Sequence, residues 1–186
     1  MDTCPENLTA RVFFALWPTD DERIALADWQ PALVRLCGGR VMRAETLHLT
    51  LVFLGEIPCN RLEALCLAAQ QVSGQCFGLS LDVARYWGHN HILYTAPRVV
   101  PPQLAQLVRE LEKQLRRQHF KFDAREYKPH VTLLRNAHWR DDPLPELPPV
   151  RLEVGSFVLL QSVQQDGAAA YRILARFPLS ESVCDP

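Results

Sequence analysis

The sequence lacks the features that would place it in several common classes of protein. No apolar run approaches the ~20 residues that a membrane-spanning helix needs. Acids and bases nearly balance, so the formal net charge of the 186 residues is −1, and the chain lacks the broad basic surface of proteins that coat long nucleic acids. We therefore expect no membrane association, and any anion must be recognised by a local site.

The six cysteines form no C-x-x-C pair, and the first residues, MDTCPENLTA, carry acids where a secretory signal would carry positive charge. Both observations favour reduced thiols and a cytoplasmic location over a disulfide framework. Hydrophobic residues make up 48% of the chain and charged residues 22%, which is typical of a folded protein rather than a disordered one. We expect one domain with its own core.

Two strand–helix–strand units are indicated by the pattern of apolar residues. In the first, RVFFALWP (11–18) predicts a buried strand, and LHLTLVFL (47–54) predicts the next one. Between them, Thr19 and Glu22 form a capping box that begins a helix running toward Leu36. Pro31 is expected to kink or restart that helix.

In the second unit, FGLSLDVARYWG (77–88) and HILYTAP (91–97) predict a pair of strands, and an amphipathic helix follows Pro102. The strand from His130 to Leu134 completes it. His48 lies 35 residues after Phe13 (48 − 13) and His130 lies 38 after Ile92 (130 − 92), so we interpret the units as a degenerate internal duplication. After a proline-rich connector (143–149), VRLEVGSFVLLQSV (150–163) and AYRILARFPL (170–179) predict two more strands.

Each unit ends in a strand that carries the pattern His-x-Thr. The first is in LHLTLVFLG (47–55) and the second in KPHVTLLR (128–135). Because residues i and i+2 of a strand point to the same side, His48 shares a face with Thr50, and His130 with Thr132. If the two units face each other, all four side chains line one cleft.

This set of side chains suits metal-free cleavage of a phosphodiester. One imidazole can take a proton from the nucleophile while the other gives a proton to the leaving group. The threonine hydroxyls can donate hydrogen bonds to phosphate oxygens, and Arg135 can add a charge-assisted contact. Arg135 stands at odd spacing from His130, so it reaches the site only if the strand ends or bulges before it, or if the side chain curls round.

The paired motifs resemble those of the two-histidine (2H) phosphoesterase superfamily, with its H-x-T-x motifs. Within it, the chain is similar to the bacterial RNA 2′,3′-cyclic phosphodiesterases, also called 2′-5′ RNA ligases. The resemblance implies an α+β, bilobal fold, in which two pseudo-symmetric antiparallel β-sheets with outer helices surround a central cleft. Residues 1–186 would then form a single domain of two pseudo-symmetric lobes that share the cleft.

The resemblance also implies hydrolysis of a terminal 2′,3′-cyclic phosphate on RNA to a 2′-phosphate, without metal or cofactor. His48 would be the proton donor to the departing 3′ oxygen, and His130 the proton acceptor that activates water. Thr50, Thr132 and Arg135 would bind the phosphate. The partners would be RNA or nucleotide ends, the protein would be a monomer, and the reverse reaction would join ends through a 2′-5′ linkage.

Several alternatives remain open at this point. The substrate could be a small cyclic nucleotide or a 2′-5′ oligonucleotide, or the chain could bind RNA ends without turnover. His89 and His91 could bind a metal, although no carboxylate or cysteine accompanies them at ligand spacing. A basic stretch could steer RNA toward the cleft or simply be the solvated end of a helix (Arg116, Arg117, Lys121, Arg125, Lys128). Four aromatic residues could stack on a terminal base (Phe53, Tyr86, Trp87, Tyr127). Strand parity favours the core for Phe53.

Overall fold

The computed structural model describes residues 8–140, 142–165 and 168–181, and it shows a mixed α+β fold with antiparallel sheets, as expected. Eight strands form one sheet in the order β10-β9-β1-β3-β7-β6-β5, with β2 beside β7, while β4 and β8 pair separately. The strands are β1 (Thr9–Leu16), β2 (Arg40–Val41), β3 (Leu49–Pro58), β4 (Phe77–Leu81), β5 (Val83–Trp87), β6 (Ile92–Ala96), β7 (Val131–Arg135), β8 (Val150–Val154), β9 (Ser156–Gln165) and β10 (Ala168–Pro178). The α-helices are α1 (Asp20–Ala27), α2 (Gln30–Cys37), α3 (Leu62–Gln70) and α4 (Pro102–Arg117).

The signals for the first two helices are confirmed. Thr19 is the N-cap of α1, and its capping box with Glu22 is complete. The chain then breaks and restarts as α2 with Pro31 in the first turn, where the missing N–H of proline costs no hydrogen bond. None of the helices in the described part of the chain has the length and apolarity to cross a bilayer.

Two of the predicted strands are each divided in the structure. The first breaks at Asp82, so that β4 pairs with β8 while β5 pairs with β6. The carboxylate of Asp82 accepts a hydrogen bond of 2.7 Å from the backbone N–H of Arg98, which fixes the break. The second breaks at Gly155, between β8 and β9. The single-strand interpretation of both segments was therefore wrong.

The large sheet consists of two halves that meet at one residue pair. The His48 half contains β1, β3, β9 and β10, and the His130 half contains β2, β5, β6 and β7. Only Leu49 and Val131 are paired between β3 and β7. In each half, the two strands that the sequence pattern joined through a helix lie next to each other and run antiparallel (β1 with β3, β6 with β7). This arrangement agrees with the predicted duplication.

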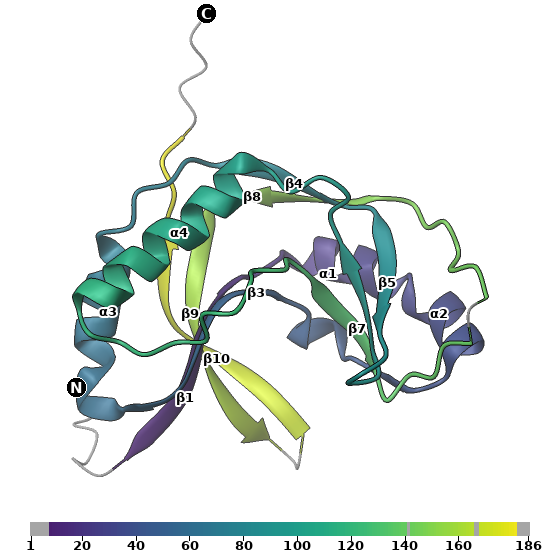
Figure 1. Cartoon of the computed structure of the whole chain (residues 1–186), viewed down its shortest axis with the longest axis horizontal. Coiled ribbons are helices and arrows are strands. Elements are labelled where there is room, and N and C mark those ends of the chain that lie inside the picture. The colour runs from purple at the N-terminus through teal and green to yellow at the C-terminus, as the bar shows by residue number, and fades with distance from the viewer. Residues whose placement is uncertain (1–7, 141, 166–167, 182–186) are drawn as a thin grey trace, which may run out of the picture.

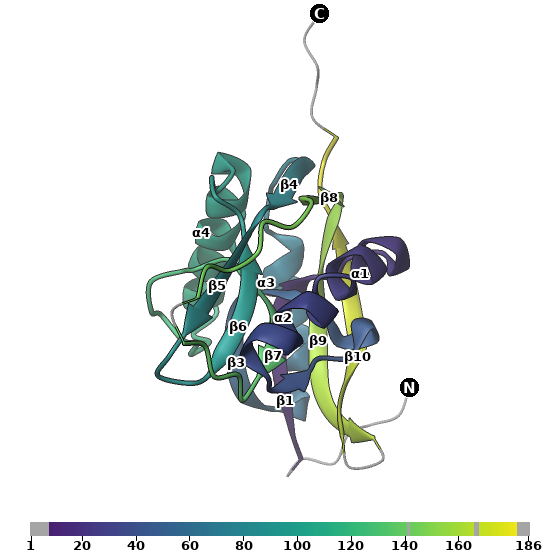
Figure 2. The same cartoon turned by 90° about the vertical axis from the view of Figure 1, so that its right-hand side faces the viewer.

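The helices are exchanged between the halves. The helix that follows β6, α4, packs against β3 and α3, and α3 also contacts β10. The helix α2, which belongs to the chain between β1 and β3, contacts β2 and β7. Figure 1 shows α3 and α4 over one end of the molecule and α1 and α2 over the other, and Figure 2 looks onto the α2 end. The apolar face of α4 is buried through Leu104, Leu107, Val108, Leu111 and Leu115.

Candidate active site

The junction between the two halves positions both His-x-Thr motifs. Leu49 and Val131, the paired residues, are fully buried and point into the core. Their neighbours therefore point to the other face, and continuing the antiparallel register places His48 opposite Thr132 and Thr50 opposite His130. The two histidines are then diagonal neighbours, which are typically separated by roughly 7–8 Å, with the Cβ atoms somewhat closer. That spacing leaves room for one phosphate between the rings.

A β-bulge after each motif brings one more side chain to the same face. In β7, Leu134 pairs with Leu93 and Thr132 with Tyr94, so Leu133 is an extra residue. Both leucines are fully buried, and the next residue, Arg135, returns to the face of the histidines and lines the cleft. Of the three routes that the sequence left open for Arg135, the structure thus shows the bulge.

The same irregularity occurs in β3, where it overturns one expectation. Ala15 pairs with Thr50 and Phe14 with Val52, so Leu51 is extra. Leu51 and Val52 are both buried, and Phe53 therefore returns to the cleft face, as Arg135 does. The parity argument that placed Phe53 with the core leucines was wrong because it assumed a regular strand.

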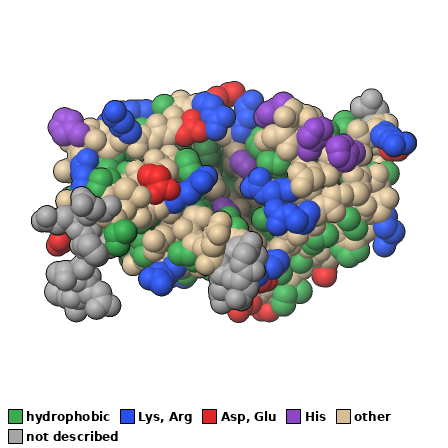
Figure 3. Space-filling model, turned by 90° about the horizontal axis from the view of Figure 1, so that it is seen from below, with side chains coloured by type: hydrophobic (Ala, Val, Ile, Leu, Met, Phe, Trp, Pro, Cys, Tyr) green, Lys and Arg blue, Asp and Glu red, His purple; other side chains and the backbone are tan. Residues whose placement is uncertain are grey.

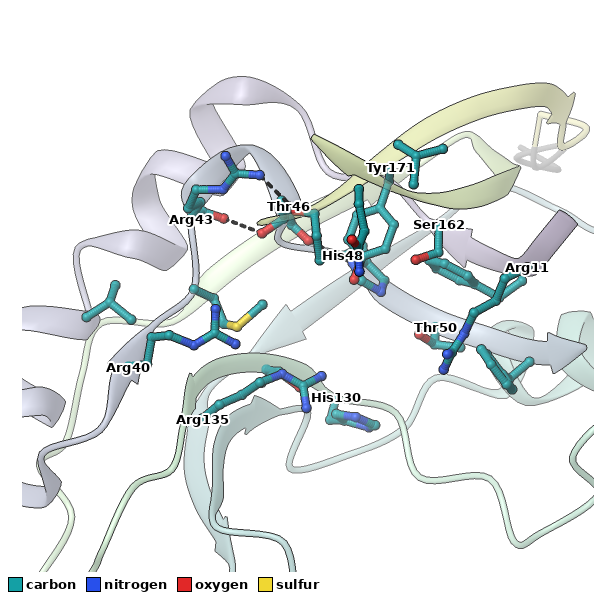
Figure 4. Close-up of a pocket in the computed structure, with 18 residues that line it drawn as sticks. Arg11, Arg40, Arg43, Thr46, His48, Thr50, His130, Arg135, Ser162 and Tyr171 are labelled. Carbon is teal, nitrogen blue, oxygen red and sulfur yellow. Dashed lines mark hydrogen bonds between the residues drawn. The ribbon is translucent and has the colours of Figure 1, made fainter. Parts of the chain in front are cut away.

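Between the two halves lies a cleft of about 570 Å³. All five predicted site residues line it, together with residues from β1, β2, β9 and β10 (His48, Thr50, His130, Thr132, Arg135; Arg11, Phe13, Arg40, Val41, Met42, Arg43, Thr46, Phe53, Ser162, Val163, Gln164, Ala169, Tyr171). Figure 3 shows the molecule hollowed between its halves, with basic side chains gathered around the hollow. In Figure 4, His48 and His130 approach the cleft from opposite walls.

His48 is held rigidly and kept neutral. Its Nδ1–H donates a hydrogen bond of 2.7 Å to the carbonyl of Thr46, which leaves Nε2 as the ring nitrogen available to the cleft. Three aromatic rings surround it, with centroid distances of 5.0 Å to Phe13, 6.2 Å to Trp17 and 4.8 Å to Tyr171. The pKa of His48 is lowered to about 4, chiefly by this burial and to a smaller extent by the charges of His130 and Arg135, against the hydrogen bond to Thr46, which raises it.

His130 repeats the arrangement on the other wall. Its Nδ1–H donates to the carbonyl of Lys128 at 2.8 Å, so Nε2 is again the free ring nitrogen. Trp87 and Tyr94 contact the ring edge to face, at 4.6 and 5.5 Å. Burial, and secondarily the charge of Arg135, lowers the pKa of His130 below its ordinary value. Both histidines therefore bind no proton at neutral pH in the absence of an anion.

The cleft is strongly basic. Four arginines line it, and no carboxylate is found among its described lining residues. Arg43 forms an ion pair with Glu45 (Nε to Oε1, 3.3 Å) and Arg11 stacks over the ring of Phe53 at 5.2 Å. Of the four arginines, only Arg135 was predicted from the sequence. The others and Tyr171 lie outside the motifs, on strands or loops whose approach to the cleft depends on the tertiary fold.

The other candidates from the sequence acquire simpler explanations. The Nδ1 atom of His91 lies 2.9 Å from the hydroxyl of Tyr86, which donates to the carbonyl of Ala137 at 2.9 Å, so Tyr86 is structural. No group of three metal-ligating side chains occurs in residues 8–140, 142–165 or 168–181. In the basic stretch, three of the five cations are ion paired (Arg116 with Glu112, Arg125 with Asp123, Lys128 with Glu126).

A second cavity, also about 570 Å³, opens on the other side of His130. It shares Thr50, Phe53, His130, Thr132 and Arg135 with the cleft, and adds the aromatic side chains of Trp87 and Tyr127. Its charges are mixed, since acidic and basic residues both line it (Glu112, Asp123, Glu126; Arg125, Lys128). The two cavities therefore meet at Thr50, His130 and Thr132, whereas His48 lines only the first.

Comparison with known proteins identifies close relatives. Residues 16–94 and 95–170 match the family described as LigT like phosphoesterase. An RNA 2′,3′-cyclic phosphodiesterase of Escherichia coli (strain K12) is 31% identical over 175 residues, which cover 92% of this chain and 97% of that protein. Crystal structures of E. coli LigT are also similar: the complex with 3′-AMP has a TM-score of 0.83 (31% identity, 92% and 99% of the two chains), and that with ATP has 0.81 (30% identity, 93% and 99%).

Proposed function

This chain belongs to the LigT like phosphoesterase family, and we propose that it is an RNA 2′,3′-cyclic phosphodiesterase that opens a terminal cyclic phosphate to a 2′-phosphate. The observation that carries the proposal is the pair of imidazoles. Each has its Nδ1–H tied to a backbone carbonyl and its Nε2 left for the cleft, from opposite walls of one pocket. Two such groups flanking one phosphate are what an in-line displacement requires.

In the proposed reaction, Nε2 of His130 takes a proton from water as its oxygen attacks phosphorus. The bond from phosphorus to the 3′ oxygen breaks, and the leaving oxygen receives a proton from Nε2 of His48. Thr50 and Thr132 donate hydrogen bonds to the non-bridging oxygens, and Arg135 offsets the charge that develops on them. The assignment of donor and acceptor follows the family resemblance. With the 5′-hydroxyl of a second RNA end in place of water as the nucleophile, the same steps would join the two ends through a 2′-5′ bond.

The low histidine pKa values are consistent with this chemistry. With a pKa of about 4 in the free protein, His48 is a strong acid once it carries a proton. The anionic phosphate stabilises that protonated form when it enters the cleft, because it lies beside the ring. Binding of the substrate therefore favours the reactive state, in which His48 is protonated and His130 is neutral, whereas both rings are neutral in the empty site. Since the side chains supply both proton transfers, we expect no dependence on a metal or cofactor.

We also propose the domain organisation, the oligomeric state and the cellular location of the enzyme. The exchange of helices supports one domain that spans the chain, acting as a monomer because both motifs come from the same polypeptide. We also propose a reducing, cytoplasmic location, because the cysteine spacing contains no C-x-x-C pair and favours reduced thiols.

The deciding experiment is product analysis on a short RNA that ends in a 2′,3′-cyclic phosphate, with EDTA present. We expect full conversion to the 2′-phosphate, identified by its resistance to an enzyme specific for 3′-phosphates. Binding without conversion would show an RNA-end binding module instead. Loss of conversion on adding EDTA, recovered with a divalent ion, would show a metal enzyme.

A further inference from the structure

Arg40 lies directly beside Arg135, and this juxtaposition of two cations requires an explanation. The two residues are partners in the β2–β7 ladder, so their side chains stand on the same face, ~5 Å apart at Cβ. Both line the cleft, and Figure 4 shows them together at one end of it, with Arg11 at the other. In the described residues no carboxylate forms an ion pair with either guanidinium. Like charges at such positions destabilise a sheet unless an anion separates them.

The fold holds Arg40 in this position at two points. Gly39 has a φ of +91°, and a Cβ at this residue would lie 2.7 Å from the carbonyl oxygen of Arg135, so only glycine permits this close approach. On the other side of Arg40, the buried side chain of Gln30 donates hydrogen bonds to the carbonyls of Met42 (2.8 Å) and Leu133 (3.1 Å). The short strand β2 is thus fixed against β7.

The charge in the cleft exceeds what one cyclic phosphate needs. A cyclic phosphodiester carries a single negative charge, and Arg135 already stands beside the histidines. Arg43 is ion paired with Glu45 and donates through Nη2 to the carbonyl of Ala169 (2.8 Å). Arg40 is therefore a cation in the cleft that is paired with neither a carboxylate nor the reacting phosphate.

We propose that Arg40 binds the phosphodiester one nucleotide upstream of the reacting cyclic phosphate. The cleft is then built for the end of an oligonucleotide rather than for a mononucleotide, and the RNA chain leaves past β2. This inference rests on the proposed phosphodiesterase activity and specifies its substrate class. The second cavity is a poorer path for the RNA chain, because Glu112, Asp123 and Glu126 line it; the terminal nucleoside fits there, beside Trp87.

The test compares two substrates, a nucleoside 2′,3′-cyclic phosphate and a dinucleotide with the same terminal nucleoside cyclic phosphate. In the wild-type protein we expect kcat/KM to be at least ~10-fold higher for the dinucleotide, since hydrogen bonds to a charged group contribute about that much. In Arg40→Gln most of this advantage should disappear, while kcat/KM for the mononucleotide changes by no more than about 2-fold.

Salt dependence provides a readout that a purely structural role would not move. With the dinucleotide, the slope of log kcat/KM against log salt concentration should become shallower by ~0.7 in Arg40→Gln, which corresponds to one lost phosphate contact on a single strand. The slope with the mononucleotide should not become shallower by that amount.

Arg125→Gln is the matched control, because Arg125 lines the second cavity and is paired with Asp123. It should keep the dinucleotide advantage. If Arg125→Gln removes the advantage and Arg40→Gln does not, the RNA chain runs through the second cavity and the inference is wrong. Equal losses on both substrates in Arg40→Gln would place Arg40 at the reacting phosphate and also overturn it. Absence of turnover on either substrate would instead refute the phosphodiesterase activity itself.

Discussion

The two halves of the site share a backbone design and differ in the side chains that surround it. In each half a histidine donates its Nδ1–H to the carbonyl two residues earlier, a threonine follows on the same face, and a bulge returns the third residue after the threonine to the cleft. That third residue is Phe53 in one half and Arg135 in the other. The duplicated backbone thus sets where the groups lie, and we predict that the unlike residues give each half its own role.

The surroundings of the histidines differ in the same sense. His48 is enclosed by Phe13, Trp17 and Tyr171, and burial lowers its pKa to about 4. His130 contacts Trp87 and Tyr94, and it belongs to the half that carries Arg135. The additional ring around His48, and the position of Arg135 on the strand that follows His130, make the two surroundings unequal.

Removing either imidazole should have the largest effect. We expect His48→Ala and His130→Ala each to lower kcat by ~10²–10⁴-fold, because each deletes one of the two proton transfers. The double variant should lose far less than the product of the two, since each transfer depends on the other. Circular dichroism should show that both variants fold. A variant that keeps near wild-type turnover would mean that the ring in question has no catalytic part.

Replacing the two unlike residues, Arg135 and Phe53, should have the second largest effect on turnover. Arg135→Gln is expected to lower kcat by about 10²-fold, the loss typical of one donor that tracks developing charge. Phe53→Leu, at the equivalent position of the other half, should cost only a few-fold because that side chain carries no charge. Steady-state kinetics on one cyclic substrate measures both. Similar losses in the two variants would contradict a division of roles between the halves.

The pH dependence should report the lowered histidine pKa values. Turnover needs one protonated and one neutral imidazole, and in the free protein both titrate below 6.5. The bell-shaped profile of kcat/KM should therefore have its maximum between about pH 4 and 6.5 and fall roughly tenfold per unit at higher pH, as the proton donor loses its proton. The optimum of kcat should lie at higher pH, since bound phosphate raises the pKa of the rings. A flat profile from pH 5 to 9 would contradict the mechanism.

Replacing the threonines should have the smallest effect on kcat/KM, and the effect should be nearly equal in the two halves. Thr50→Val and Thr132→Val each remove one hydroxyl donor to the phosphate at nearly constant volume, and each is expected to cost about 10-fold in kcat/KM. The two losses should agree within a few-fold, because the register places the threonines equivalently. A loss confined to one variant would show that the phosphate sits toward one half.

Local sequence signals predicted the elements well and the shape of the cleft poorly. The capping box at Thr19 and the leucine pattern of α4 are set by neighbouring residues, and both were confirmed. The bulge that returns Phe53 to the cleft depends on pairing with β1, so strand parity alone gave the wrong face. Arg40 was not found because its position follows from Gly39 approaching the end of β7, a contact between segments about 100 residues apart. The roles of the site residues remain predictions.

The exchange of helices has a consequence for how such a molecule could be divided. Neither repeat can be excised as a self-sufficient fragment, because α2 would leave with the first repeat although it packs on β7, and α4 would leave with the second although it packs on β3. A second copy could supply the missing helix in exchange for its own. If the gene arose by fusion of two copies, this geometry makes an intertwined homodimer the natural ancestor, with one imidazole contributed by each polypeptide.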